Sequence, residues 1–89
     1  MSVALVTYEL KTPGRSYQPV FDYLQTFTHC KEMEAVWLLD TPKAITEIRD
    51  HLRTLIDAND VVLVVRLTAE WASSCFNCGN WLNKTERGW

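Results

Sequence analysis

The sequence predicts a single α+β domain, and this prediction rests on the order and the apolar patterning of its segments. Four short segments have the length and composition of strands, and two longer segments have the spacing of amphipathic helices. Their order along the 89 residues is strand, helix, strand, strand, helix, strand. Two right-handed crossovers then place both helices on one face of a four-stranded sheet, antiparallel or mixed, with strand order 4-1-3-2. This is the ferredoxin-like arrangement.

The first half of the chain supplies a strand, a helix and a weaker strand. Residues 2–10 alternate as a strand does, and a Pro-Gly pair in the following loop favours a turn. We expect a helix over residues 17–28, with Ser16 as its N-cap. The apolar side chains on one face of that helix are Val20, Phe21, Leu24 and Phe27. Residues 29–33 are expected to form a weak strand.

The second half supplies the two strongest strands and the second helix. Residues 35–39 form a short apolar strand, and Thr41-Pro42 gives an N-cap followed by proline at the first helical position. The helix predicted over residues 42–57 carries its apolar face on Ile45, Ile48, Leu52, Leu55 and Ile56. Residues 61–67 are the most apolar run of the chain and form the last strand.

The predicted strands are apolar on both faces, although two helices cover only one. An open second face would leave an apolar patch of several hundred Å². The domain over residues 1–72 therefore needs a cover, either the tail at residues 73–89 or a second subunit. We favour a homodimer over a tail-capped monomer, because the last strand is also a bare sheet edge. The residues expected at the interface are Val61, Leu63, Val65, Trp71 and Trp81.

Three acidic residues are candidates for a metal site. In the 4-1-3-2 order we expect strands one and three to run parallel, so Glu9 and Asp40 end at one rim of the sheet, where Asp60 begins strand four. Such a cluster could hold hydrated Mg²⁺ or Mn²⁺ and position a water near a phosphate, with Glu9 as the catalytic residue. The alternative is that Asp40 and Asp60 are ordinary turn residues beside helix ends. For these two the turn role is favoured, and more narrowly for Glu9.

Three cysteines raise the question of zinc or redox chemistry. Cys75 and Cys78 form a C-x-x-C pair, which is half of a zinc site. The only other cluster of ligand types is His29-Cys30, and adjacent strand residues point to opposite faces, so at most one of them could join. Free thiols in a reducing compartment are the favoured interpretation. Zinc and disulfide chemistry are the less favoured alternatives.

A loop near the N-terminus is a candidate anion site. Lys11 and Arg15, together with Tyr17, lie next to the expected start of the first helix. Backbone N–H groups at a helix N-terminus attract anions, and two cations nearby would add to that attraction. The alternative is a solvated loop, which we favour.

Charge and segment lengths restrict the cellular setting. The net charge of −2 gives no bulk attraction to nucleic acid, so RNA or DNA would need a local basic patch. No stretch approaches the roughly 20 apolar residues of a membrane span, and the N-terminus lacks the features of a signal peptide. We expect a cytoplasmic protein without membrane contact, whose partners are a second copy and either a nucleic acid or another protein.

Several motifs along residues 2–72 carry a family resemblance. They include Tyr8-Glu9-Leu10, Pro13-Gly14-Arg15, Val36-Trp37-Leu38-Leu39-Asp40-Thr41, Ile48-Arg49-Asp50, Val64-Val65-Arg66-Leu67 and Glu70-Trp71-Ala72. These motifs resemble small bacterial and phage proteins labelled the SinR family, which are distinct from the helix-turn-helix regulator of that name. Such proteins are similar in turn to the small CRISPR-associated spacer-acquisition subunit and to related toxin–antitoxin ribonucleases.

That resemblance implies a ferredoxin-like homodimer linked to nucleic-acid metabolism. In the nuclease-like members an Asp near the end of strand one binds metal at the dimer interface. The matching position here is Glu9, and Arg15 is a loose match to the Arg expected soon after it. Our first hypothesis is a homodimeric interaction module associated with nucleic acid or a defence system, without a cofactor. The alternatives are a metal-dependent endoribonuclease using Glu9 with Mg²⁺ or Mn²⁺, and a zinc protein organised by Cys75 and Cys78.

Overall fold

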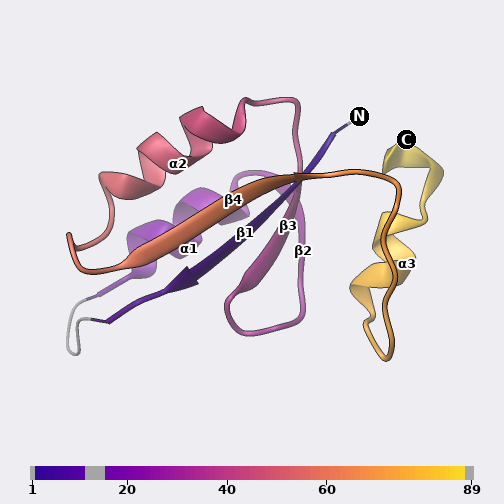
Figure 1. Cartoon of the computed structure of the whole chain (residues 1–89), viewed down its shortest axis with the longest axis horizontal. Coiled ribbons are helices and arrows are strands. Elements are labelled where there is room, and N and C mark those ends of the chain that lie inside the picture. The colour runs from indigo at the N-terminus through magenta and orange to yellow at the C-terminus, as the bar shows by residue number, and fades with distance from the viewer. Residues whose placement is uncertain (1, 12–15, 88–89) are drawn as a thin grey trace.

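The computed structural model describes residues 2–11 and 16–87, which fold into one sheet, two long helices and a helical tail (Figure 1). The elements in chain order are β1 (Val3–Glu9), α1 (Gln18–Gln25), β2 (Thr28–Lys31), β3 (Val36–Asp40), α2 (Ile45–Arg53), β4 (Val61–Leu67), α3 (Cys78–Leu82) and the 3₁₀ turn η1 (Thr85–Arg87). The β-α-β-β-α-β order predicted from the sequence is confirmed.

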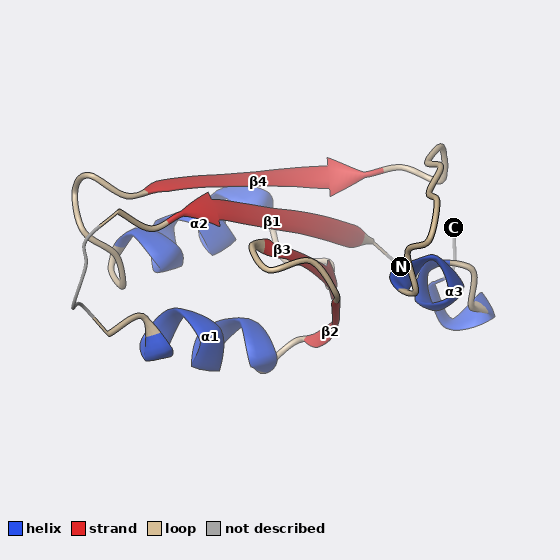
Figure 2. Cartoon of the chain, turned by 90° about the horizontal axis from the view of Figure 1, so that it is seen from below, coloured by secondary structure: helices blue, strands red, loops and turns tan. Residues whose placement is uncertain are grey.

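The sheet has the strand order β2-β3-β1-β4, which is the predicted 4-1-3-2 order. All three neighbouring pairs are antiparallel, because each crossover joins strands that are not neighbours. Both α1 and α2 lie on the same side of the sheet, as Figure 2 shows. We call this side the helix face and the opposite side the second face. β4 is an edge strand, as expected.

The main core lies between the helix face and the two helices. Its buried residues are Ala4, Val6, Val20, Leu24, Trp37, Leu39, Ile48 and Leu52. Each helix contributes residues spaced four apart, Val20 with Leu24 and Ile48 with Leu52, so one stripe of each helix is buried. The strands contribute alternate residues, which is the two-residue period of a strand. This core therefore follows directly from the two periodicities in the sequence.

Both helices are shorter than predicted. The first ends at Gln25, and the strand that follows already begins at Thr28. The second begins at Ile45 rather than at Pro42, because the loop before it is not helical: the backbone of Ala44 has a ψ of 137°. Arg66 donates to the carbonyl oxygen of Thr41 over 2.9 Å and also to that of Lys43. Those carbonyl oxygens are therefore held by a guanidinium outside the helix.

The tail covers one end of the second face. Part of the tail is helical, which the sequence did not predict. Its helix α3 lies beyond the end of β4 (Figure 2). A second apolar cluster joins the buried residues Val3, Leu38, Cys78 and Leu82, with partly buried Leu5, Cys30, Leu67, Trp71, Phe76 and Trp81 around it. Within the described residues, no helix is long and apolar enough to cross a membrane.

A disulfide, an ion pair and the Glu32 carboxylate fasten the tail to the sheet and to the loop after β2. The Glu32 carboxylate accepts hydrogen bonds from the backbone N–H groups of Asn77 and Cys78. A disulfide joins Cys30 in β2 to Cys78 in α3, across 48 residues of sequence. Arg87 Nη1 lies 2.7 Å from Asp40 Oδ2, and both side chains are buried, with 5% and 7% of their surface exposed. The covered end of the second face is therefore held by a covalent bond and a buried ion pair.

Candidate functional site

The tail leaves the opposite end of the second face open. Val61 and Leu63, at the start of β4, are 48% and 54% exposed, whereas Val3 on the adjacent strand is completely buried. Cross-strand pairing places Val61 opposite Glu9 and Leu63 opposite Thr7, and neither partner shields them. Large apolar side chains at a bare edge are the usual mark of an interaction surface. We call Val61, Leu63, Val65 and the free edge of β4 the β4 surface.

The five residues expected at an interface divide into two groups. Val61, Leu63 and Val65 belong to the β4 surface. Trp71 and Trp81, by contrast, pack against the second-face cluster of their own chain. Trp81 also lies beneath the Arg87 guanidinium, 4.0 Å from its ring centroid, so this tryptophan helps to seat the tail.

The prediction that three carboxylates share one rim is wrong. Asp40 pairs with Val3 at the start of β1, whereas Glu9 lies at the end of the same strand. The error lies in the assumed direction of β3, which runs antiparallel to β1. Asp40 is instead the buried partner of Arg87, and its role in this structure is to hold the tail.

Asp60 is a structural carboxylate that ties together three loops. Its Oδ1 accepts a hydrogen bond from the backbone N–H of Lys11, over 2.7 Å. Its Oδ2 accepts from the Tyr17 hydroxyl over 2.7 Å and from the Asp57 backbone N–H over 2.8 Å. Both oxygens are therefore engaged by donors that fix the ends of β1, α1 and α2. This agrees with the turn role that the sequence favoured.

Glu9 is exposed and lies beside Val61. Among residues 2–11 and 16–87, no group of three His, Cys, Asp or Glu side chains is arranged to hold a metal ion. The metal site predicted from Glu9, Asp40 and Asp60 is therefore not assembled within the described part of one chain. Of the two anion-site residues, Arg15 lies outside the described residues, and Lys11 is exposed and donates its backbone N–H to Asp60.

The cysteines pair in a way the sequence did not favour. The expectation of free thiols is wrong for Cys30 and Cys78, which are disulfide-bonded, and holds for Cys75, which is exposed and free. The disulfide occupies Cys78, one of the two sulfurs of the C-x-x-C pair, together with Cys30, and leaves Cys75 as the free thiol. No local signal predicts it, because it depends on the path of the tail over the sheet.

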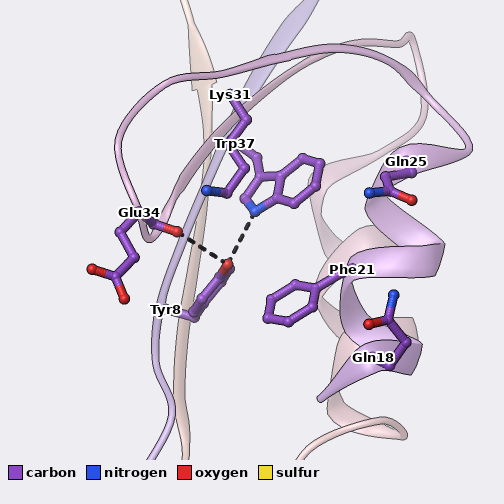
Figure 3. A pocket seen from close by; sticks show the side chains of 7 residues that line it. All are labelled: Tyr8, Gln18, Phe21, Gln25, Lys31, Glu34 and Trp37. Carbon is purple, nitrogen blue, oxygen red and sulfur yellow. Dashed lines mark hydrogen bonds between the residues drawn. The ribbon is translucent and has the colours of Figure 1, made fainter. Parts of the chain in front are cut away.

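A groove on the helix face is the second surface of interest (Figure 3). Its volume is about 410 Å³, within the range of small-molecule sites. The Tyr8 hydroxyl accepts a hydrogen bond from Trp37 Nε1 over 3.0 Å and contacts the Glu34 carbonyl at 3.5 Å. The groove is lined by Tyr8, Gln18, Phe21, Gln25, Lys31, Glu34 and Trp37.

Three polar side chains that line this groove, those of Gln25, Lys31 and Glu34, are unengaged among the described residues. Neither Gln25 nor Lys31 forms a hydrogen bond or ion pair with the described residues, although the Lys31 ammonium lies 5.7 Å from the Trp37 ring centroid. Aromatic walls with a free cation and a free amide suit a planar ligand that carries hydrogen-bonding groups. Sequence reasoning missed this groove, because Tyr8, Phe21 and Trp37 come from three separate elements.

Comparison with known proteins adds no assignment to this geometry. No model of a protein family matches the chain, and no solved structure shows a significant match to it. The ferredoxin-like arrangement is present in the structure itself, as an α+β fold with four antiparallel strands. The likeness to SinR family proteins rests on the quoted motifs alone.

Proposed function

We propose that this protein is a homodimeric interaction module that assembles through the β4 surface. The observation that carries the proposal is the exposure of Val61 and Leu63, at 48% and 54%, on an edge strand. Burying a fully exposed side chain of this kind is worth about 1.5–3 kcal/mol, and roughly half of that gain is open to side chains that are already half-buried. A second copy would bring the same residues twice, because a two-fold interface uses one patch on both subunits.

The role we propose is binding rather than catalysis. Two of the three carboxylates suggested for a metal site have structural partners, Asp40 with Arg87 and Asp60 with Tyr17. The nuclease alternative would therefore depend on Glu9 alone. The motif resemblance to SinR family proteins supports a ferredoxin-like dimer associated with nucleic acid or a defence system, and we include that association in the proposal.

Light scattering on three proteins tests the dimer. The wild type should have a mass near twice the chain's 10.3 kDa at tens of micromolar. Leu63→Lys places a charge in the β4 surface and should give a monomer. Met33→Lys is the matched control, because Met33 is 51% exposed but lies outside β4, and it should remain a dimer. A monomeric wild type would refute the proposal.

Single-stranded nucleic acid is the second candidate ligand, at the groove beside Tyr8. Unstacked bases bind aromatic side chains, with about 1–3 kcal/mol per stacked base, and cations hold the phosphates. The Lys31 ammonium, 5.7 Å from the Trp37 ring centroid, lines the same groove as the rings of Tyr8 and Phe21, so the groove offers both kinds of contact. The net charge of −2 limits such binding to this local patch.

A charge reversal tests the groove. Lys31→Glu should weaken binding of a short single-stranded RNA severalfold in a filter-binding assay, and should make the remaining binding less sensitive to salt. Lys84→Glu is the control, because it changes charge equally at an exposed position next to α3 and outside the groove. Equal affinity for Lys31→Glu and Lys84→Glu would exclude the groove as the binding site.

A further inference from the structure

Resting on the proposed dimer, we infer that two copies join by antiparallel pairing of β4 with β4 of the partner, which makes one continuous eight-stranded sheet. β4 pairs with β1 over all seven of its residues without a gap, so the strand has no bulge. It contains no proline and a single charged residue, Arg66. The devices that normally prevent edge-to-edge pairing are bulges, prolines and charges, and β4 has almost none of them.

The one charged residue of β4 does not oppose this pairing. The Arg66 guanidinium donates to the carbonyl oxygens of Thr41 and Lys43, so it is turned toward the loop before α2. In a fully overlapped antiparallel pair, the two copies of Arg66 lie four residues apart along the strand, or about 13 Å. Like charges are therefore not placed opposite each other.

A groove lies beside the free edge of β4. It has a volume of about 210 Å³ between α2 and β4. Its lining residues are Ile45, Thr46, Arg49, Val62, Leu63 and Val64. Arg49 already forms an ion pair with Asp50, at 2.8 Å, so two copies of α2 approach each other without an unpaired cation at this wall. The residues that line this groove therefore place no unpaired charge against a second copy of the same chain.

The register follows from symmetry. In an antiparallel pair related by a two-fold axis, full overlap of seven residues places the axis at the central residue, which is Val64. Leu63 then lies opposite the partner's Val65, and Val61 lies opposite the partner's Leu67. The second-face side chains of both copies form one apolar row, which shields Val61 and Leu63. No other fully overlapped register is available to this strand.

Cysteine cross-linking measures that register. Residues directly opposite each other lie about 4.5–5.5 Å apart between Cα atoms, within the range of roughly 4.4–6.8 Å that a disulfide spans. Two copies of residue 64 satisfy this condition, whereas two copies of residue 61 lie about 20 Å apart. Val64→Cys and Val61→Cys are made in a Cys75→Ser background, which removes the free thiol and leaves the Cys30–Cys78 disulfide intact.

Both proteins are treated with oxidised glutathione, which accepts the two electrons, and are run on a non-reducing gel. We expect Val64→Cys to form a covalent dimer at least about tenfold faster than Val61→Cys, because only its thiols meet. The double variant Leu63→Cys with Val65→Cys should also cross-link, which guards against a local defect at residue 64. A wild type that is dimeric by light scattering while neither of these variants cross-links overturns the β4 pairing and leaves the proposed dimer standing. A monomeric wild type overturns both the β4 pairing and the proposed dimer. The β4 edge would then be a binding site for a strand of another protein.

Discussion

The two edges of the sheet are treated very differently. β2 has four residues, three of them polar, and Cys30 at its centre is bonded to the tail helix α3. β4 has seven residues, six of them apolar, and pairs only with β1 within the described chain. Short, polar and covered edges resist pairing with other chains, whereas long apolar edges invite it.

The difference shows how a small domain can direct its assembly. The same chain fastens its tail over one end of the second face with a disulfide and the Asp40–Arg87 pair, and leaves the end beside Val61 and Leu63 bare. An exposed apolar edge carries a risk of aggregation unless a partner covers it. We therefore interpret the contrast as one edge closed for stability and the other kept for a second copy.

The largest effect should come from removing the disulfide at the closed end. Replacing Cys30 and Cys78 together by Ser should lower the free energy of unfolding by up to about 4 kcal/mol, since a link across 48 residues restricts the unfolded chain. Urea unfolding measures this change. Cys75→Ser is the control, because Cys75 is exposed and unbonded. A midpoint equal to that of the control would mean that the tail is held without the disulfide.

Breaking the buried ion pair should have the next largest effect. Asp40→Asn removes the buried counter-charge of Arg87 and leaves it, among the described residues, only the exposed Glu86 carboxylate, 3.9 Å from Nη2, which costs about 3 kcal/mol for a buried pair. Limited proteolysis should then cut the tail first, and thermal unfolding should occur at a lower temperature. The control is Asp50→Asn, because Asp50 pairs with Arg49 at the exposed surface and should change stability little. Equal effects of the two substitutions would contradict the assigned role of Asp40.

A smaller change is expected at the helix face, away from both edges. The buried Tyr23 hydroxyl has no hydrogen-bond partner among the described residues, so Tyr23→Phe should stabilise the fold by about 1 kcal/mol. Burial, and secondarily the charge of Glu47, raises the pKa of Tyr23 above its usual 10.0. The folded state then holds this proton more tightly than the unfolded state. The free energy of unfolding therefore declines as the pH rises above 10.0, where the unfolded state begins to lose the proton.

Unfolding curves at neutral and alkaline pH test both parts of this prediction. Tyr23→Phe should lose less stability at alkaline pH than the wild type does. The substitution should change neither the attachment of the tail at β2 nor dimer formation at β4. A destabilised Tyr23→Phe protein would show that the hydroxyl does have a partner in solution.

The sequence was sufficient for the topology and for the bare edge, because both depend on local patterns. The apolar run at residues 61–67 predicts the last strand, and helical spacing around Ile48 and Leu52 determines which side of that helix faces the core. Crossover handedness then sets the strand order. The same rules place Asp40 opposite Val3, at the start of β1, rather than beside Glu9 at its end. The wrong prediction of a shared carboxylate rim therefore came from assigning β3 the wrong direction.

The tail contacts could not be predicted in this way. Cys30 and Cys78 are 48 residues apart, and Asp40 and Arg87 are 47 apart, with no repeating pattern that links them. Each pair forms only because the tail passes over the second face. The start of α2 was missed for a related reason, since Arg66 on β4 holds carbonyl oxygens that the helix would otherwise use.

Amide hydrogen exchange at the two edges is the most direct test of the central claim. Exchange is measured for β2 and β4 at low and at high protein concentration. If a second copy pairs with β4, protection across Val61–Leu67 should rise with concentration, while protection of Thr28–Lys31 stays constant. Protection of β4 that does not depend on concentration, in a protein that remains a monomer, would contradict the account.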